Sequence, residues 1–171
     1  TICEDRNFTD NILKQYGRSN VVILSTLWKK NDLENLNDII KLLIADDKIV
    51  IITSPSLESK LFQPHNFNLL DSLVYKRKSL LEKDVNFAKK EMFKYFKVIK
   101  NEQHKKLEMI AKKNQVKYLL QSDFQCDVKN NECYVLTDQK HKIYWDYGHY
   151  TNAGAKYLGI KAHKIDWFNF D

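Results

Sequence analysis

The segment from Trp145 to Ala155 places an Asp three residues before a His, just ahead of a predicted helix. An imidazole with a carboxylate behind it can act as a general base, because the carboxylate fixes its tautomer and stabilises the imidazolium. Asp146 and His149 are therefore candidate catalytic residues, two of the three members of a hydrolase triad. Thr151 can cap the following helix, and Gly148 lets the turn fold tightly. The alternative is a surface turn that contains both residues without any chemistry.

The remaining four histidines lack a carboxylate placed as Asp146 is placed relative to His149. One of them, His163, falls within a helix that is otherwise structural. We assign no chemistry to this group, which comprises His65, His104, His141 and His163.

The elements around the Asp-x-x-His motif follow a recognisable order. From about Asn101 the sequence predicts an amphipathic helix, a short apolar strand, two nearby cysteines and a polar hairpin, followed by Asp-x-x-His-x-Thr-x-x-Gly-Ala. This order resembles the C-terminal half of an SGNH (GDSL-like) domain, of the type fused to acyltransferase-3 membrane O-acyltransferases that acetylate bacterial surface polysaccharides. Upstream, residues 21–28 are similar to the family's central strand, which ends in a Trp. The residues that carry the resemblance are Asn101, Leu107, Ala111, Val116, Lys117, Tyr118, Leu119, Leu120, Cys126, Cys133, Asp146, His149, Thr151, Gly154 and Ala155.

The nucleophile of that family, a serine in a Gly-Asp-Ser motif near the start of the domain, has no counterpart in this sequence. None of the four glycines begins a Gly-Asp pair, and there is no Gly-x-Ser-x-Gly elbow. The chain starts at Thr1 without a Met, and in the family a cysteine resembling Cys3 lies well after the nucleophile. We therefore expect a fragment that lacks the first βα unit. The alternative is a domain that never had the serine and is catalytically inactive.

The resemblance implies acyl transfer through a covalent ester. An upstream serine would attack an acetyl group, His149 would take its proton, and Asp146 would orient His149. Water would then give hydrolysis, and a sugar hydroxyl would give transfer to a polysaccharide. We expect Thr26, Trp28 and Ser54 to contact substrate, because they lie at or just after the ends of predicted strands, and we expect no cofactor and no metal. A non-catalytic domain of the same fold that binds glycan or a partner is the alternative.

Two of the three cysteines are close in sequence. Cys126 and Cys133 enclose a mostly polar loop with an Asn-Asn pair that turns readily, so both sulfurs could come within bridging distance. A disulfide implies an oxidising compartment, and we therefore expect an extracytoplasmic location in a bacterium, periplasmic or at the cell surface. Zinc is disfavoured because no second cysteine pair or suitably spaced His completes a ligand set. Cys3 is left to pair upstream or to remain a buried thiol.

Length and composition favour a single SGNH-like domain over residues 1–171. The 43% hydrophobic content is ordinary for a globular protein, and the longest apolar stretches, 21–28 and 49–53, are too short to cross a bilayer. The net charge of +6 is spread among carboxylates, which favours a solvated surface over nucleic-acid binding. We expect a carbohydrate and an acyl donor as partners, a fused or adjacent membrane acyltransferase domain, and no nucleic acid.

Hydrophobic periodicity predicts the alternation of strands and helices typical of a parallel α/β protein. We expect a three-layer α/β/α sandwich with a parallel sheet, SGNH-like or flavodoxin-like, without its first βα unit. The predicted elements are strands at 20–27, 48–53 and 116–120, helices from 31–32 to 46–47 and at 152–163, two or three helices within 69–113, a loop at 55–68 that could contact substrate, and a short hairpin or irregular arm at 134–144.

Overall fold

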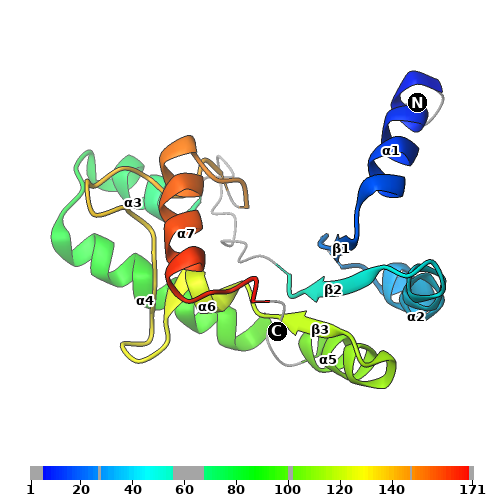
Figure 1. The fold of residues 1–171 in the computed structure, drawn as a ribbon. Coiled ribbons are helices and arrows are strands. Elements are labelled where there is room, and N and C mark those ends of the chain that lie inside the picture. Colours follow the sequence, from blue (N-terminus) through cyan, green and yellow to red (C-terminus); the bar gives the residue numbers. More distant parts are fainter. Residues whose placement is uncertain (1–5, 27, 56–67, 100–101, 147, 170–171) are drawn as a thin grey trace. The chain divides into compact units, whose positions relative to one another are not determined.

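The computed structural model describes residues 6–26, 28–55, 68–99, 102–146 and 148–169 (Figure 1). The chain divides into two compact units. The first, which we call the sheet unit, comprises residues Thr1–Thr53 and Lys106–Tyr118. The second, which we call the disulfide unit, comprises residues Ser54–Lys105 and Leu119–Asp171.

The sheet unit is built on three strands in the order β1-β2-β3. β1 runs parallel to β2, with Val21 opposite Ile49 and Leu24 opposite Ile52. A parallel pair needs a crossover connection, which α2 supplies here. The elements are α1 (Arg6–Arg18), β1 (Val21–Leu24), α2 (Lys30–Ala45), β2 (Ile49–Thr53), most of α5 (Gln103–Asn114) and β3 (Lys117–Leu119).

The core of the sheet unit lies on one face of β2. Val50 and Ile52 are two residues apart, so their side chains share that face, where residues of α2 and α5 cover them. Trp28 lies in the same cluster, and its indole N–H donates to the carbonyl of Thr53 at 2.9 Å. Apolar side chains at helical spacing thus explain why α2 and α5 dock on the sheet. The buried members are Trp28, Leu36, Ile40, Val50, Ile52, Leu107 and Ala111.

The disulfide unit is mainly helical. Its only regular strand pair among the described residues is β4 with β5, which run antiparallel with Cys126 opposite Cys133. Asn131, in the turn between them, adopts the left-handed conformation with φ 55°, which Asn tolerates well. The elements are α3 (Leu69–Arg77), α4 (Glu82–Ile99), α6 (Ser122–Gln125), β4 (Cys126–Asp127), β5 (Glu132–Cys133) and α7 (Asn152–Lys164).

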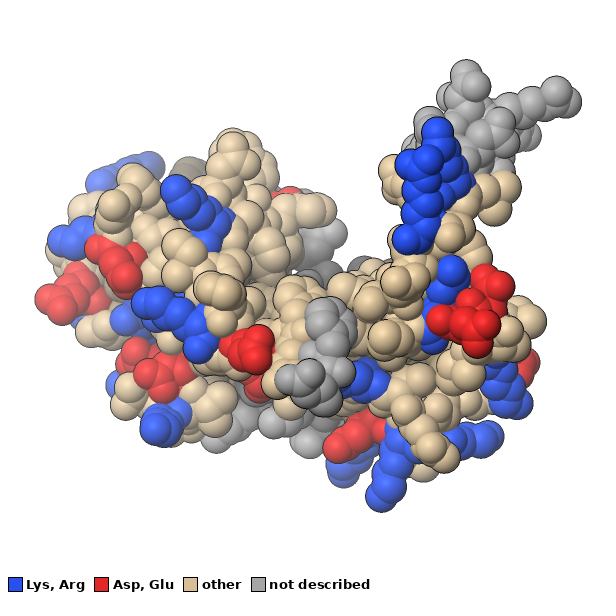
Figure 2. All heavy atoms as spheres, in the orientation of Figure 1, with Lys and Arg blue, Asp and Glu red and all other residues tan. Residues whose placement is uncertain are grey.

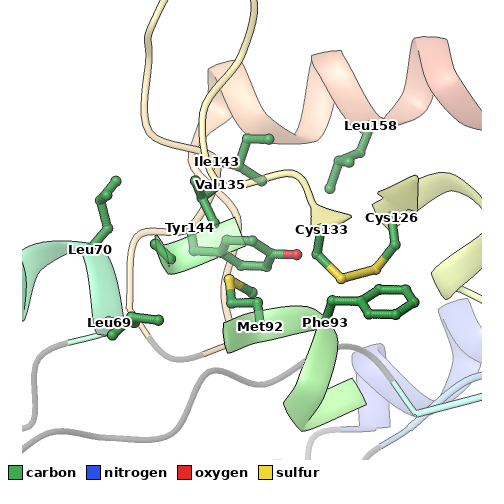
Figure 3. Packing of buried hydrophobic residues seen from close by; sticks show 11 residues of the cluster. Leu69, Leu70, Met92, Phe93, Cys126, Cys133, Val135, Ile143, Tyr144 and Leu158 are labelled. Carbon is green, nitrogen blue, oxygen red and sulfur yellow. A yellow bond between two sulfur atoms is a disulfide. The ribbon is translucent and has the colours of Figure 1, made fainter. Parts of the chain in front are cut away.

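A second core surrounds the cystine of this unit (Figure 3). Met92 and Phe93 of α4 and Leu158 of α7 point into it, and the ring of Tyr144 fills the space between them. The segment that leads to the Asp-x-x-His motif is thus anchored in a packed interior. The other buried members are Leu69, Leu70, Ala88, Cys126, Cys133, Val135 and Ile143.

The expected α/β class with a parallel sheet is confirmed. The segment 69–113 forms three helices, and the arm at 134–144 is irregular, with isolated bridges from Leu136 to Lys142 and from Tyr144 to Tyr150. β1 ends at Leu24, earlier than expected, and α1 has no counterpart among the predicted elements. The predicted substrate loop at 55–68 lies almost wholly outside the described residues, as do Cys3 and His65.

Each helix that the structure describes is too short or too polar to cross a membrane.

Candidate active site

Asp146 and His149 face each other across a short turn. Nδ1 of His149 lies 2.8 Å from Oδ2 of Asp146. The other carboxylate oxygen, Oδ1, accepts from the backbone N–H groups of Gly148 at 2.9 Å and His149 at 2.8 Å. An ionised carboxylate only accepts hydrogen bonds, so Nδ1 must carry a proton and Nε2 keeps its lone pair when the ring is neutral. The His149 side chain is 75% exposed.

The hydrogen bonds to Asp146 keep it ionised. Burial opposes ionisation, but the backbone N–H groups of Gly148 and His149, followed by the imidazole, lower the pKa of Asp146 to about 2. The carboxylate therefore bears a full negative charge throughout the range in which a histidine titrates. Such a charge can stabilise the imidazolium that forms when His149 accepts a proton.

The turn that holds this pair is closed at its base. The backbone N–H of Trp145 donates to the carbonyl of His149 at 2.7 Å, and a bridge pairs Tyr144 with Tyr150. The rings of these two tyrosines lie 5.5 Å apart between centroids. Because Tyr144 is buried in the core, the residue that precedes Trp145 at the base of the turn is held in place by packing.

The first turn of α7 docks against the chain segment that precedes the motif. Thr151 caps the helix as predicted, since its Oγ1 accepts from the N–H of Gly154 at 2.9 Å. The same hydroxyl donates to the carbonyl of Lys142 at 2.5 Å, and the Thr151 N–H donates to the carbonyl of Ile143 at 2.9 Å. A Cβ on Gly154 would lie 2.1 Å from that Ile143 carbonyl oxygen, so only glycine permits this approach.

An ion pair ties α3 to the same segment. Nζ of Lys142 lies 2.9 Å and 2.7 Å from the two carboxylate oxygens of Asp71. It also lies 3.4 Å from the carbonyl of Trp145, which accepts from the Asn68 side chain at 3.4 Å as well. Asn68 in turn caps α3 by accepting from the N–H of Asp71. The ion pair and the Asn68–Trp145 bond join residues more than 70 positions apart, and sequence reasoning missed them because no local pattern signals them.

The cystine lies in the core below the turn. Cys126 and Cys133 are bonded, as expected from their spacing. Tyr144 and Tyr150 lie in or against the same cluster, and the Gln125 amide donates to the Tyr150 hydroxyl. Burial, followed by the proximity of Tyr150, raises the pKa of Tyr144 well above its ordinary value, so this tyrosine stays protonated. We assign it a structural role.

A protein-family comparison identifies the chain. The model of the SGNH domain (fused to AT3 domains) matches residues 1–162, a range that runs through both units. The chain belongs to this SGNH family. The solved structure of the lipopolysaccharide acetyltransferase periplasmic domain from Salmonella ser. Paratyphi A is similar, with a TM-score of 0.54 and 16% sequence identity. The similarity covers 94% of this chain and 62% of that one, and at this identity it shows the fold. No curated protein matches the chain.

The residues of this SGNH domain that we expected to contact substrate fall in different units. Thr26 is exposed and lines a hollow of about 430 Å³ in the sheet unit together with Trp28, whose indole N–H is already bonded to Thr53. Ser54 belongs to the disulfide unit, as do Asp146 and His149. It is 1% exposed, and its hydroxyl accepts from the backbone N–H of Gln121 at 2.9 Å. The roles of these three residues stay predictions.

The other described histidines differ in burial. His104 is buried, whereas His141 and His163 are exposed. Within the described ranges, no three His, Cys, Asp or Glu side chains of this SGNH domain are grouped to hold a metal ion.

Proposed function

We propose that this SGNH domain transfers acetyl groups to, or hydrolyses them from, a cell-envelope polysaccharide. The observation that carries the proposal is the contact of Asp146 Oδ2 with His149 Nδ1 at 2.8 Å, in a family defined by its fusion to acyltransferase domains. The similar solved structure is the periplasmic domain of a lipopolysaccharide acetyltransferase, which supports a saccharide substrate.

In the proposed mechanism, Asp146 and His149 complete a Ser-His-Asp triad with a serine from a Gly-Asp-Ser segment outside this sequence. Nε2 of His149 takes the serine proton as the serine oxygen attacks the acetyl carbonyl, and Asp146 stabilises the imidazolium. The imidazolium then protonates the leaving group, which yields an acetyl-serine ester. Water or a sugar hydroxyl next attacks this ester and gives up its proton to His149, which passes the proton to the serine oxygen as the ester bond breaks. Water gives acetate, whereas a sugar hydroxyl gives an acetylated glycan.

We further propose an extracytoplasmic location next to a membrane acyltransferase domain in a bacterium. The cystine favours an oxidising compartment, since disulfides rarely persist in the cytosol. The family description, with its fused acyltransferase domains, supports the partner, and the periplasmic neighbour supports the compartment.

The direct test is acetyl turnover by the full-length protein that carries this chain. We expect His149→Ala to lower turnover by about three orders of magnitude or more, as loss of a triad base does. His163→Ala is the matched control, because His163 is an exposed histidine on α7 without a carboxylate partner, and it should leave turnover unchanged. Turnover within about threefold of wild type in His149→Ala would refute the assignment. Saturable polysaccharide binding without any turnover in the wild type would favour a non-catalytic binding domain.

A further inference from the structure

A groove on the disulfide unit runs along the first half of α7. Its wider part has a volume of about 650 Å³ and is lined by residues of α3, by the 140–142 segment and by the N-terminus of α7. A narrower hollow of about 280 Å³ continues it past the 137–141 turn and the middle of α7. Both parts share His141 and Ala153 as lining residues, so they adjoin. A ligand that fills both must be extended, such as a chain of linked units.

The groove carries a local excess of positive charge. Lys140 lines the wider part and Lys156 the narrower part, and neither forms an ion pair with any residue that the structure describes. Lys142, by contrast, is neutralised by Asp71, and Asp138 is the other carboxylate of the lining, which leaves a net charge of +1 along the groove. The N-terminal end of the α7 dipole adds a partial positive charge at the groove wall. On the face drawn in Figure 2, Lys and Arg lie among Asp and Glu over much of the surface. Two unpaired lysines along one groove therefore favour an anionic ligand.

The narrower part also has the composition of a site for a polar ring. Tyr157 lines it, with its ring edge-to-face against Tyr134 at 5.7 Å between centroids and the ammonium group of Lys161 at 5.2 Å from its centroid. Its hydroxyl donates to Asp138 at 3.1 Å, which fixes the ring. Asp138 and Gln139 border the same hollow with groups that can accept or donate hydrogen bonds. An aromatic side chain with planar polar groups around it suits a sugar ring, which has C–H faces and a rim of hydroxyls.

We propose that this groove binds an acidic saccharide chain. Carboxylate or phosphate groups of the chain contact Lys140 and Lys156, and one sugar ring lies against Tyr157 with its hydroxyls bonded to Asp138 and Gln139. Leu70 and Leu80 line the wider part and contact the C–H faces of the neighbouring sugars. This assignment deepens the proposed function and rests on it for the link to turnover, because it names the class of polysaccharide.

The groove begins close to the candidate catalytic turn in the sequence. Thr151 and Asn152, which line its wider part, follow His149 by two and three residues. A saccharide chain bound along α7 therefore contacts residues two and three positions beyond His149, whose own side chain does not line the groove. The neighbouring charged sugars would hold the chain while one unit reacts, since binding energy from remote groups can position a substrate.

The test is calorimetric titration of the full-length protein with polygalacturonate, which has a carboxylate on every sugar. Two polymers serve as comparisons: dextran has sugars without charge, and polyglutamate has carboxylates without sugars. We expect both to bind at least about tenfold more weakly than polygalacturonate, because each lacks one of the two contacts. Phosphorylated mannan shows in a parallel titration whether phosphate replaces carboxylate.

Substitutions of the two lysines test the charge contacts. Lys140→Asn suits the backbone, because Lys140 has φ 62° and Asn tolerates this conformation, and Lys156→Gln changes an exposed helix position. Each should raise the Kd for polygalacturonate about two- to fivefold, the range of an exposed ion contact, and the double variant about tenfold. Lys164→Gln, at an exposed position in the last turn of the same helix, is the matched control and should leave the Kd unchanged.

Two substitutions of Tyr157 test separately whether its aromatic ring and its hydroxyl contribute to binding: Tyr157→Phe removes the hydroxyl, and Tyr157→Leu removes both. The first keeps the aromatic face and should bind polygalacturonate within about twofold of wild type, whereas the second should bind at least about fivefold more weakly. The proposal is overturned if Lys164→Gln weakens binding as much as Lys140→Asn, or if polyglutamate binds as tightly as polygalacturonate.

His149→Ala distinguishes this proposal from the proposed function. It should abolish turnover and leave polygalacturonate binding intact. If turnover depends on His149 but polygalacturonate binding does not depend on Lys140 or Lys156, the groove proposal is refuted and the catalytic function stands. If binding depends on these lysines but no turnover depends on His149, the catalytic function is refuted and the groove proposal stands.

Discussion

The approach of α7 to the Ile143 backbone makes a sharp prediction for Gly154→Ala. The added Cβ would lie 2.1 Å from the Ile143 carbonyl oxygen and 2.7 Å from the carbonyl carbon and from Cα. All three are backbone atoms, which cannot rotate away as a side-chain end could. The first turn of α7 must therefore move, and the hydrogen bonds of Thr151 to Gly154 and to Lys142 must lengthen with it.

The expected change in the free energy of unfolding follows from opposing effects of the added methyl group. Overpacking in a rigid setting costs about 1–3 kcal/mol, and disturbing the Thr151 cap adds about 1 kcal/mol. The better helix propensity of Ala returns at most about 1 kcal/mol. With the full propensity gain counted, these contributions sum to a loss of about 1–3 kcal/mol in the free energy of unfolding of Gly154→Ala.

Gly159→Ala is the matched control for this substitution. Gly159 lies in the same helix, is exposed, and a Cβ there would meet nothing within 4 Å. This variant should raise the free energy of unfolding by up to about 1 kcal/mol, because it removes the flexibility of glycine without adding a clash. Urea unfolding of both variants, followed by circular dichroism, gives the two free energies directly.

A Gly154→Ala variant as stable as the wild type would refute the predicted clash, as would a shift of both variants in the same direction. Equal m-values in the three proteins are needed for the comparison, because a change in m would signal a change in the unfolded or native ensemble. If only Gly154→Ala lowers the free energy of unfolding, the close approach to Ile143 explains why glycine is needed at position 154, and a general effect of replacing glycine in α7 does not.

Two further predictions concern the site and its support. The pKa of Asp146 is about 2 in the folded chain, below its ordinary 3.8, so its ionisation stabilises the fold above about pH 4 and this contribution is lost as the pH falls towards 2. A ¹³C NMR titration of the Asp146 carboxyl should give a midpoint near 2, and a midpoint at 3.8 would contradict the three hydrogen bonds. Replacing Cys126 and Cys133 together by Ser should lower the free energy of unfolding by about 2.5 kcal/mol, the chain-entropy value for a loop of this length. Thermal unfolding with and without reductant checks this prediction. A variant with the same Tm as the oxidised wild type would contradict it.

The sequence predicted what short-range chemistry determines. The Thr151 cap, the Asp146–His149 contact and the cystine each join residues no more than seven positions apart, and each appears in the structure. Hydrophobic periodicity likewise indicated α2, β2 and α7 to within two residues, because apolar side chains must repeat with the helix or strand to reach a core.

Long-range packing could not be predicted in this way. The Asp71–Lys142 ion pair and the contact of Gly154 with Ile143 depend on how α3 and α7 dock, and neither leaves a local signature. The groove between α3, the 137–142 segment and α7 is hidden from the sequence for the same reason. The early end of β1 at Leu24 and the presence of α1 were also missed, the helix although its 13 residues form an amphipathic pattern.

The two carboxylate oxygens of Asp146 have different hydrogen-bond partners, which suit a structural role for one oxygen and a catalytic role for the other. Oδ1 alone accepts the N–H groups of Gly148 and His149, and these two bonds add to the Trp145–His149 backbone bond that closes the turn. Oδ2 is left for Nδ1 of His149, a contact that the backbone does not need.

Asp146→Asn tests this division. The Asn carbonyl oxygen can take the place of Oδ1, so the turn should persist, but the amide N–H₂ then faces Nδ1 and favours the tautomer with the proton on Nε2. The lone pair needed for a general base moves to the wrong nitrogen, and turnover of the full-length protein should fall by about 10⁴, as in the corresponding Ser-His-Asp variant. ¹⁵N NMR of the His149 ring reports the tautomer independently of turnover. If the proton stays on Nδ1 in the variant, Oδ2 does not set the tautomer, and the motif is a structural turn that happens to contain a histidine.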